Sequence, residues 1–250
     1  MGKSSVKAKS PTPSTDTELA VQEALSWLRE TASSGVRDGM ARFGIPCGKA
    51  LGVPVGTVQA FAKSLGRDAA LSNALWDTDV YEARHLAIFT GDPARVTPEQ
   101  MDRWCADFDN WALCDAACFH LFDRVPHAFQ KVTAWAEETG EFQKRAAFAL
   151  LASLALHHKK ASDAEFLDGL PLIEAAADDD RNFVKKAVNW ALRSIGSRNP
   201  ALHAEALTVS RRLAASGIPS ARWIGRDALR QLSSAATLRR IAPKNKPARE

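Results

Sequence analysis

The feature that most constrains this chain is a helical periodicity that recurs almost from end to end at a regular spacing. Apolar residues follow one another at intervals of three and four, and the alternation typical of strands is nearly absent. Longer helices are expected to begin near Asp79, Asp109, Glu141, Asp180 and Ser220, at offsets of 30, 32, 39 and 40 residues. A shorter helix is expected before each of them, beginning near Asp68, Pro98, Pro126, Ser162 and Asn199. Offsets of this size are typical of two-helix repeats.

The segments before this series also have helical patterns. Helices are expected over 16–29, 35–43 and 55–65. One helix pair cannot bury its own apolar face, so neighbouring pairs must stack, and the inner helices then line a concave surface. We therefore predict an all-α fold, a curved solenoid of antiparallel helix pairs that forms one domain over residues 15–240. The alternative is a compact orthogonal bundle, which is less favoured because no helix is apolar on all sides.

The two ends differ from this pattern. Residues 1–14 are basic and rich in Ser and Pro, and residues 241–250 are rich in Lys, Arg and Pro. Both are expected to be flexible tails, and both would add non-specific attraction for a polyanion.

The distribution of charge indicates the class of partner. The whole chain carries a net charge of only +4. Residues 181–250 contain 15 Lys or Arg and 3 Asp or Glu, a net charge of +12, whereas residues 1–180 carry a net charge of −8. Clustered cations repel one another unless a partner neutralises them, so this asymmetry favours a polyanionic partner over a merely solvated surface.

Several classes of site are not expected. The four cysteines include no CxxC pair, and Cys114 and Cys118 lie one helical turn apart in an apolar helix, as core thiols do. Adjacent His157 and His158 point to different faces of a helix and make a poor ligand pair. No metal and no cofactor are therefore predicted. The chain has no 18-residue apolar span and no secretory signal pattern, so we expect a cytoplasmic protein without a membrane partner.

The helix expected after Asp109 carries the first candidate site. Trp111 and Asp115 lie four residues apart and share a face, while Leu113, Ala117 and Leu121 supply a packing face. A carboxylate among small apolar residues is costly unless it is paired or faces solvent. The structural alternative is an Asp that bonds to a neighbouring helix.

Two later helices carry candidate cations. Arg145 flanks an apolar stripe and has a guanidinium to offer, either to a ligand or across a helix interface to Asp115. Lys186, Trp190 and Arg193 form a ridge of cation, aromatic ring and cation, which is suited to contacting phosphates and stacking on a sugar or base. The alternative is a core Trp that is shielded by the stems of its neighbours. The last helix pair repeats this theme with Arg222, Trp223, Arg226 and Arg230.

Five segments together resemble a known family. They are Met40–Phe43, Trp76 with Tyr81–Arg84, Asn110–Asp115, Lys144–Ala147 and Phe183–Arg193. In this order and at these spacings they resemble the AlkD-like DNA alkylation repair family over about residues 36–235. The resemblance implies a curved array of HEAT-like helix pairs that holds duplex DNA in its groove.

The resemblance also implies an activity. The best-known members of the family are glycosylases that excise cationic N3- and N7-alkylpurines without flipping the base. Trp111 and Trp190 would pack against the deoxyribose of the lesion, and Asp115 would lie near its anomeric carbon. Arg145 would bind the backbone beside the lesion. A monomer associated with the nucleoid is expected, with no metal and no lyase step.

The remaining basic residues extend the expected DNA-binding surface. It comprises Arg145, Lys186, Arg193 and Arg226, with Phe43 beside the lesion. Family glycosylases carry Tyr in the segment that matches Met40–Phe43, and Phe43 keeps the ring but loses the hydroxyl.

Two other functions are compatible with the sequence. A non-catalytic module that binds damaged or branched DNA would use the same basic surface. A protein-binding scaffold is a common role of helical solenoids, although the ridge formed by Lys186, Trp190 and Arg193 favours nucleic acid over an acidic peptide.

Overall fold

Local capping residues determine where several of the helices begin. The Asp68 side chain accepts hydrogen bonds from the backbone N–H groups of Ala70 and Leu71, and it caps the next helix. Thr97 and Asn199 do the same before helices whose first residue is a proline. These side chains accept from N–H groups that no helical carbonyl can reach, which is why the predicted starts are close to the observed ones.

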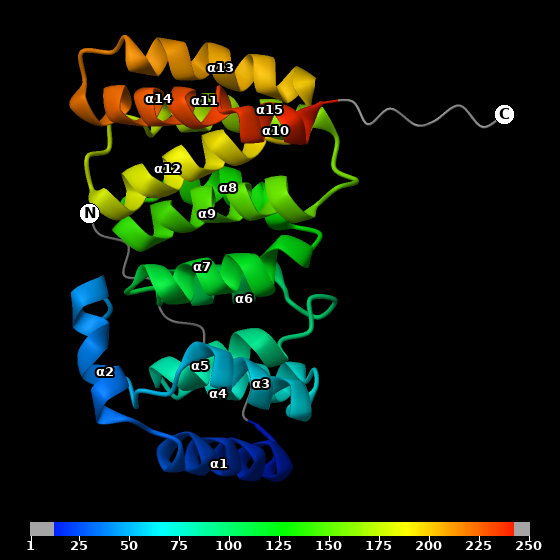
Figure 1. Ribbon diagram of the computed structural model, residues 1–250. Coiled ribbons are helices and arrows are strands. Elements are labelled where there is room, and N and C mark those ends of the chain that lie inside the picture. Colours follow the sequence, from blue (N-terminus) through cyan, green and yellow to red (C-terminus); the bar gives the residue numbers. More distant parts are fainter. Residues whose placement is uncertain (1–12, 243–250) are drawn as a thin grey trace, which may run out of the picture. The chain divides into compact units, whose positions relative to one another are not determined.

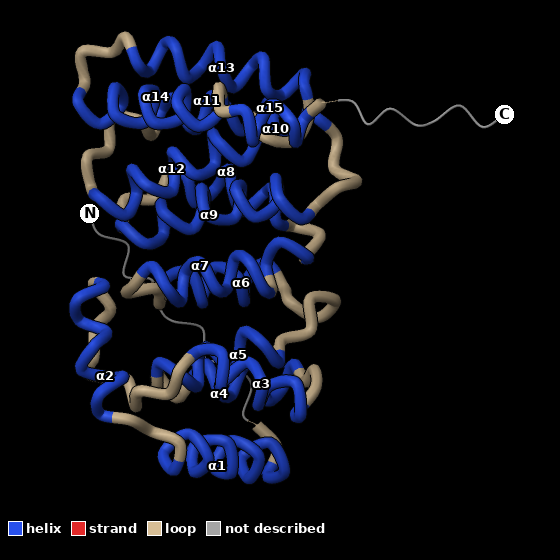
Figure 2. The backbone as a smooth tube through the Cα atoms, viewed as in Figure 1, coloured by secondary structure: helices blue, strands red, loops and turns tan. Residues whose placement is uncertain are grey.

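The computed structural model describes residues 13–242, and within that range it contains helices and loops but no strand (Figures 1 and 2). The first half contains α1 (Thr15–Glu30), α2 (Ser34–Met40), the 3₁₀ helix η1 (Ala41–Phe43), α3 (Val55–Leu65), α4 (Ala69–Asp77), α5 (Tyr81–Thr90), α6 (Pro98–Ala106), α7 (Trp111–His120) and η2 (Phe122–Arg124). The second half contains α8 (Ala128–Ala136), α9 (Glu141–His157), α10 (Asp163–Leu167), α11 (Gly169–Ala175), α12 (Asn182–Ile195), α13 (Pro200–Ala214), α14 (Pro219–Leu232) and α15 (Ala235–Ile241).

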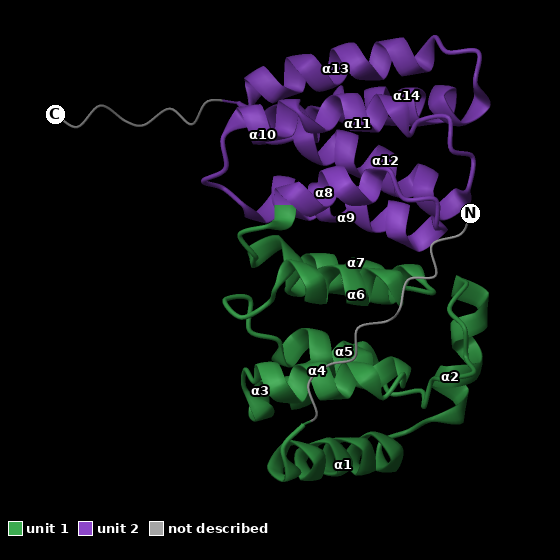
Figure 3. Cartoon of the chain, turned by 180° about the vertical axis from the view of Figure 1, so that it is seen from behind, with its two compact units in different colours: residues 1–128 green, residues 129–250 purple. Residues whose placement is uncertain are grey.

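The chain groups into two compact units, residues 1–128 and residues 129–250, which are coloured separately in Figure 3. That residues 15–240 act as one domain stays a prediction. Most of the two expected tails lies outside the described residues. Within the described range, Ser14 caps α1 and Ile241 is the last residue of α15.

An aromatic stack forms the centre of the first unit. The Trp76 and Trp104 rings lie parallel with centroids 4.0 Å apart, and both are fully buried. The Arg84 guanidinium lies 4.9 Å from the Trp76 ring and forms ion pairs with Asp79 at 2.9 Å and Asp107 at 3.6 Å. Pairing with two carboxylates allows this cation to be almost buried, and it joins α4 and α5 to the end of α6.

The second unit is built around α9, and here one sequence expectation was wrong. Every residue from Arg145 to Ala155 is buried, so α9 is enclosed on all sides, although no such helix was expected. Its small residues, Ala146, Ala147, Ala149 and Ala152, allow close packing against α12. Alanine contributes little to a hydrophobic pattern, which is why the enclosure was not apparent.

Three details of the helix pattern also differ from expectation. The fourth short helix is divided into α10 and α11, because Pro171 has no backbone N–H with which to continue the hydrogen bonding of α10. An additional helix, α15, follows α14. The N-cap of α7 is Asn110 and not Asp109.

The cysteines and the expected packing faces agree with the sequence interpretation. Cys105, Cys114 and Cys118 are buried thiols, and burial together with contact with Cys114 raises the pKa of Cys118 above its ordinary value. The predicted packing residues of α7, namely Leu113, Ala117 and Leu121, are fully buried.

Candidate nucleic-acid interface

In the first unit, the N-cap of α7 positions the first two candidate residues. The Asn110 side chain accepts a hydrogen bond from the backbone N–H of Leu113 at 3.0 Å, which fixes Trp111 as the first helical residue. Trp111 and Asp115 follow one turn apart, and both are half-buried, whereas Leu113 and Ala117 are buried on the packing side. The indole and the carboxylate therefore share the more accessible side of α7, as the spacing predicts.

A third candidate residue is brought to Trp111 from far away in the sequence. The Trp111 indole Nε1 donates a hydrogen bond to the backbone carbonyl oxygen of Phe43 at 2.8 Å. The Phe43 side chain is 57% exposed, and the Arg42 guanidinium lies 5.0 Å from its ring centroid. This part of the first unit thus presents an aromatic ring, an indole and a nearby cation, with Asp115 one turn along α7.

The loop after Phe43 is held by a residue to which the sequence analysis assigned no role. The buried Glu82 carboxylate accepts hydrogen bonds from the backbone N–H groups of Leu51 at 2.9 Å, Gly52 at 2.7 Å and Val53 at 3.3 Å. Gly52 has φ +91°, and a Cβ there would lie 2.1 Å from the Ser33 carbonyl oxygen. Only glycine fits this backbone. A glutamate within the apolar helix α5 was the available signal, since a buried carboxylate requires donors.

In the second unit, α12 presents the predicted ridge. Lys186 is exposed, and Trp190 and Arg193 are half-buried. Lys186 forms no ion pair or hydrogen bond with any other residue that the structure describes. It is therefore available to a polyanion.

Arg193 is held by α14. It forms an ion pair with Asp227 at 3.6 Å and a hydrogen bond with Gln231. Burial lowers the pKa of Arg193, although the Asp227 charge opposes that effect. Asp227 also accepts a hydrogen bond from Asn189 Nδ2 at 2.7 Å and pairs with Arg230. Sequence reasoning missed Asp227, which links α12 to α14.

The Arg145 side chain lies inside the second unit and does not project into solvent. It is almost buried, and its guanidinium Nη1 donates to the Phe183 carbonyl oxygen at 2.6 Å, at the start of α12. The Phe183 ring centroid lies 6.0 Å away. This hydrogen bond joins α9 to α12 and gives Arg145 a structural role. That it also binds a DNA backbone stays a prediction.

The last predicted residue, Arg226, lies on α14. Together with Pro219, Arg222, Trp223, Asp227 and Arg230 it lines a cavity of about 480 Å³. Arg226 is exposed, and Trp223 is 40% exposed. Lys185 Nζ of α12 lies 5.2 Å from the Trp223 ring centroid. Cations and aromatic rings therefore lie next to one another on α12 and α14.

The sequence of this chain matches the model of one known protein family. The family model described as DNA alkylation repair enzyme matches residues 24–232. The chain belongs to the DNA alkylation repair enzyme family. The resemblance stated from five short segments is thereby confirmed. No curated protein matches this family member.

Several solved structures are similar to this DNA alkylation repair family member. One comes from a family described as related to the HEAT-like repeat DNA glycosylases and as having affinity for branched DNA structures. It is 17% identical, with a TM-score of 0.69, over 84% of this chain and 94% of that chain. At this identity the likeness establishes the all-α HEAT-like fold. A designed armadillo repeat protein in complex with a (KR)4 peptide is 15% identical, with a TM-score of 0.45, over 87% of this chain and 95% of that chain.

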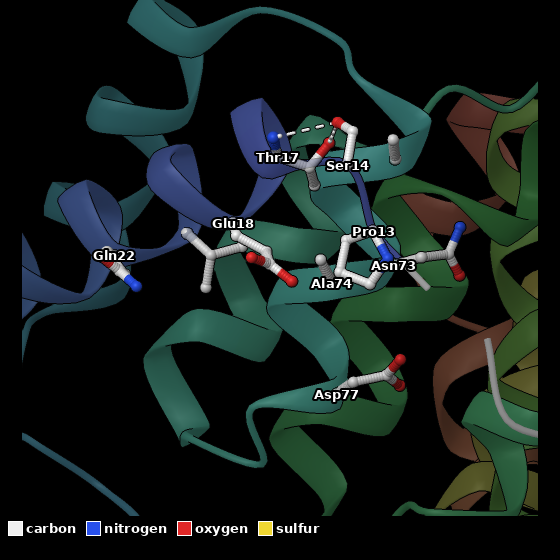
Figure 4. Close-up of a pocket in the computed structure, with 10 residues that line it drawn as sticks. Pro13, Ser14, Thr17, Glu18, Gln22, Asn73, Ala74 and Asp77 are labelled. Atoms are coloured by element: carbon white, nitrogen blue, oxygen red, sulfur yellow. Dashed lines mark hydrogen bonds between the residues drawn. The ribbon is translucent and has the colours of Figure 1, made fainter. Parts of the chain in front are cut away.

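A larger cavity in the first unit of this family member contains none of the predicted site residues. Its volume is about 510 Å³, and it lies between α1 and α4 (Figure 4). Glu18 and Asp77 are among its lining residues, and Arg103 of α6 binds Asp77 and Asn73 at 2.6 Å each. The described residues that line it include no Lys or Arg, and Arg103 already pairs with Asp77, so the cavity lacks the cations that a nucleic-acid site needs.

Within residues 13–242, no group of His, Cys, Asp and Glu side chains is arranged to hold a metal ion. None of the described helices combines the length and the apolar character that crossing a bilayer requires.

Proposed function

We propose that this protein is a monofunctional DNA glycosylase that hydrolyses the N-glycosidic bond of N3- and N7-alkylated purines in duplex DNA. The observation that carries the proposal is the arrangement on α7. An indole and a carboxylate share one accessible helix face, and an exposed aromatic residue is bonded beside them. Membership of the DNA alkylation repair enzyme family supports this assignment.

The chemistry follows from the charge of the substrate. An alkylated purine is already cationic, so it leaves with the electron pair of the glycosidic bond and needs no protonation. The positive charge then develops on the deoxyribose, where the Asp115 carboxylate and the face of the Trp111 indole would stabilise it. A water molecule forms the new bond at the anomeric carbon and gives its proton to Asp115 or to solvent. No lysine nucleophile takes part, so no lyase step follows.

The second unit contributes affinity in this proposal. Lys186, Arg193 and Arg226 would bind phosphates, and the resemblance gives Trp190 the role of packing against a deoxyribose. The net charge of +12 over residues 181–250 supports a polyanionic partner. The bond between Arg145 and the Phe183 carbonyl suggests that Arg145 supports the start of α12, next to this surface.

The direct test is an excision assay. Methylated duplex DNA is incubated with the protein, and free 7-methylguanine and 3-methyladenine are separated and measured. Release of either base above the rate seen without protein supports the proposal. Methylated DNA that keeps its bases while being bound by the protein would contradict it.

A second candidate function is a non-catalytic module that binds damaged or branched DNA. Two observations favour it. Phe43 lacks the hydroxyl of the family Tyr, and a relative with the same fold is described as having affinity for branched DNA structures. Binding of branched DNA together with no excision under any condition would select this function over the first.

A further inference from the structure

The cavity on α14 that Trp223 and Arg226 line has no part in the base hydrolysis proposed above. Trp223 exposes 40% of its surface, and the residues that line the cavity of about 480 Å³ beside it include Arg222, Arg226 and Arg230. A large aromatic residue left open to water loses the free energy that burial would supply, so an exposed ring beside cations points to a ligand.

The opposite side of α14 is packed tightly and leaves Trp223 no route into the core. Gly225 lies against the α13 backbone, where a Cβ would be 2.2 Å from the Ala214 nitrogen. Ala221, Ile224 and Ala228 are buried. The helix is therefore fixed in its rotation, and Trp223 is held on the open side before any ligand arrives. This reduces the entropy lost on binding.

The charges around the ring favour an anion. Lys185 Nζ lies 5.2 Å from the ring centroid, and Arg226 forms no ion pair or hydrogen bond with any other residue that the structure describes. Among the described residues that line the cavity, the one carboxylate belongs to Asp227, which is engaged by Arg193, Arg230 and Asn189. Because that negative charge is already neutralised, the cavity as a whole attracts phosphate groups.

We propose that this cavity binds a nucleotide with an unpaired base, which stacks on Trp223 while Lys185 and Arg226 contact the adjacent phosphates. This inference rests on DNA being the partner in the proposed function. In a continuous duplex both faces of each base are covered by its neighbours, so the ring selects a single-stranded end, a gap or a branch. Stacking on an aromatic side chain accepts every base, because each base has a π face.

The test uses unmethylated DNA, so that it does not depend on glycosylase activity. Affinities are measured by fluorescence anisotropy for a duplex and for the same duplex with a short single-stranded overhang. The wild-type protein is expected to prefer the overhang DNA. Trp223→Ala should weaken binding of the overhang DNA about tenfold and change duplex binding far less, whereas Trp223→Phe should keep most of the preference.

A spectroscopic signal tests stacking directly. The fluorescence of 2-aminopurine in the overhang should be quenched by the wild-type protein and not by Trp223→Ala. Arg226→Ala should weaken binding, whereas Arg211→Ala, an exposed arginine on α13 outside the cavity, should not. Circular dichroism melting of each variant establishes that it is folded.

The outcomes distinguish a failure of the proposed stacking site from a failure of the proposed function. If the wild-type protein binds both DNAs equally and Trp223→Ala changes neither affinity, the inference is overturned while DNA binding stands. If an oligo-glutamate peptide displaces the overhang as effectively as DNA does, the cavity is a peptide site and the inference is also overturned. If the wild-type protein binds neither DNA at low salt, the proposed function itself fails.

Discussion

Trp111 and Phe43, 68 residues apart in the chain, are joined by a hydrogen bond from the indole Nε1 to the backbone carbonyl oxygen. The bond uses the indole edge and leaves the ring face for other contacts. The bond is made to the backbone of Phe43, so it does not depend on a side-chain hydroxyl at position 43. The absence of the family Tyr therefore does not by itself remove the loop from the candidate site.

Replacing Trp111 by Phe should loosen this loop. The variant keeps an aromatic ring but removes the donor, so the free energy of unfolding should fall by about 1 kcal/mol. Hydrogen exchange in a peptide covering residues 41–50 should become faster. Trp27→Phe is the matched control, because Trp27 stacks on Phe61 without a bond to this loop. Unchanged exchange in Trp111→Phe would show that other contacts hold the loop.

Replacing Asp115 by Asn should abolish excision while leaving DNA binding nearly intact. The amide is almost the same size but cannot stabilise a cationic sugar, so the rate of base release should fall by at least about 100-fold. Asp16→Asn on α1, which also removes one carboxylate, should excise at the wild-type rate. Excision by Asp115→Asn at a rate near that of the wild type would remove Asp115 from the proposed mechanism.

Replacing Lys186 by Ala should change how binding depends on salt. If Lys186 neutralises one phosphate, the slope of log affinity against log salt concentration should decrease in magnitude by about 0.9. Affinity for unrelated duplex sequences should fall to the same extent. Lys63→Ala on α3 removes an equal charge and should leave the slope as it is in the wild type. Equal slopes in all three proteins would exclude Lys186 from the interface.

Replacing Glu82 by Gln should destabilise the first unit. The carboxylate accepts three backbone hydrogen bonds, whereas the amide has a weaker acceptor and adds donors that face other donors. The free energy of unfolding should fall by about 1.5–3 kcal/mol, measured by urea denaturation. Glu23→Gln, exposed on α1, should have almost no effect. A Glu82→Gln variant as stable as the wild type would mean that water can replace the carboxylate.

Acidification should destabilise the protein through His85. This side chain is buried beside Tyr81, Phe89 and His120, and burial lowers its pKa to about 4. The unfolded chain has the ordinary His pKa of about 6.5 and binds a proton that the folded protein does not. Stability therefore falls as the pH drops from about 6.5 to about 4, by about 3 kcal/mol from this residue. In His85→Phe that portion of the pH dependence of urea denaturation should disappear, and an unchanged pH profile would refute the assignment.

The sequence by itself determined the features that depend on neighbours along the chain. Caps such as Asp68, Thr97 and Asn199 act within three residues, so the helix starts could be predicted closely. The shared face of Trp111 and Asp115 and that of Lys186, Trp190 and Arg193 follow from 3.6 residues per turn. The excess of cations after residue 180 is a property of composition alone.

Only the tertiary structure decided which distant groups meet. The bond from Trp111 to Phe43, the three donors at Glu82 and the links from Asp227 to α12 all join parts of the chain that are far apart in sequence. It also placed the Arg145 guanidinium against the Phe183 carbonyl. The physical reason is that a buried polar side chain needs a hydrogen-bond partner. That partner is a polar group that the packing of the helices places nearby. That partner depends on how the helices pack, which no local pattern specifies.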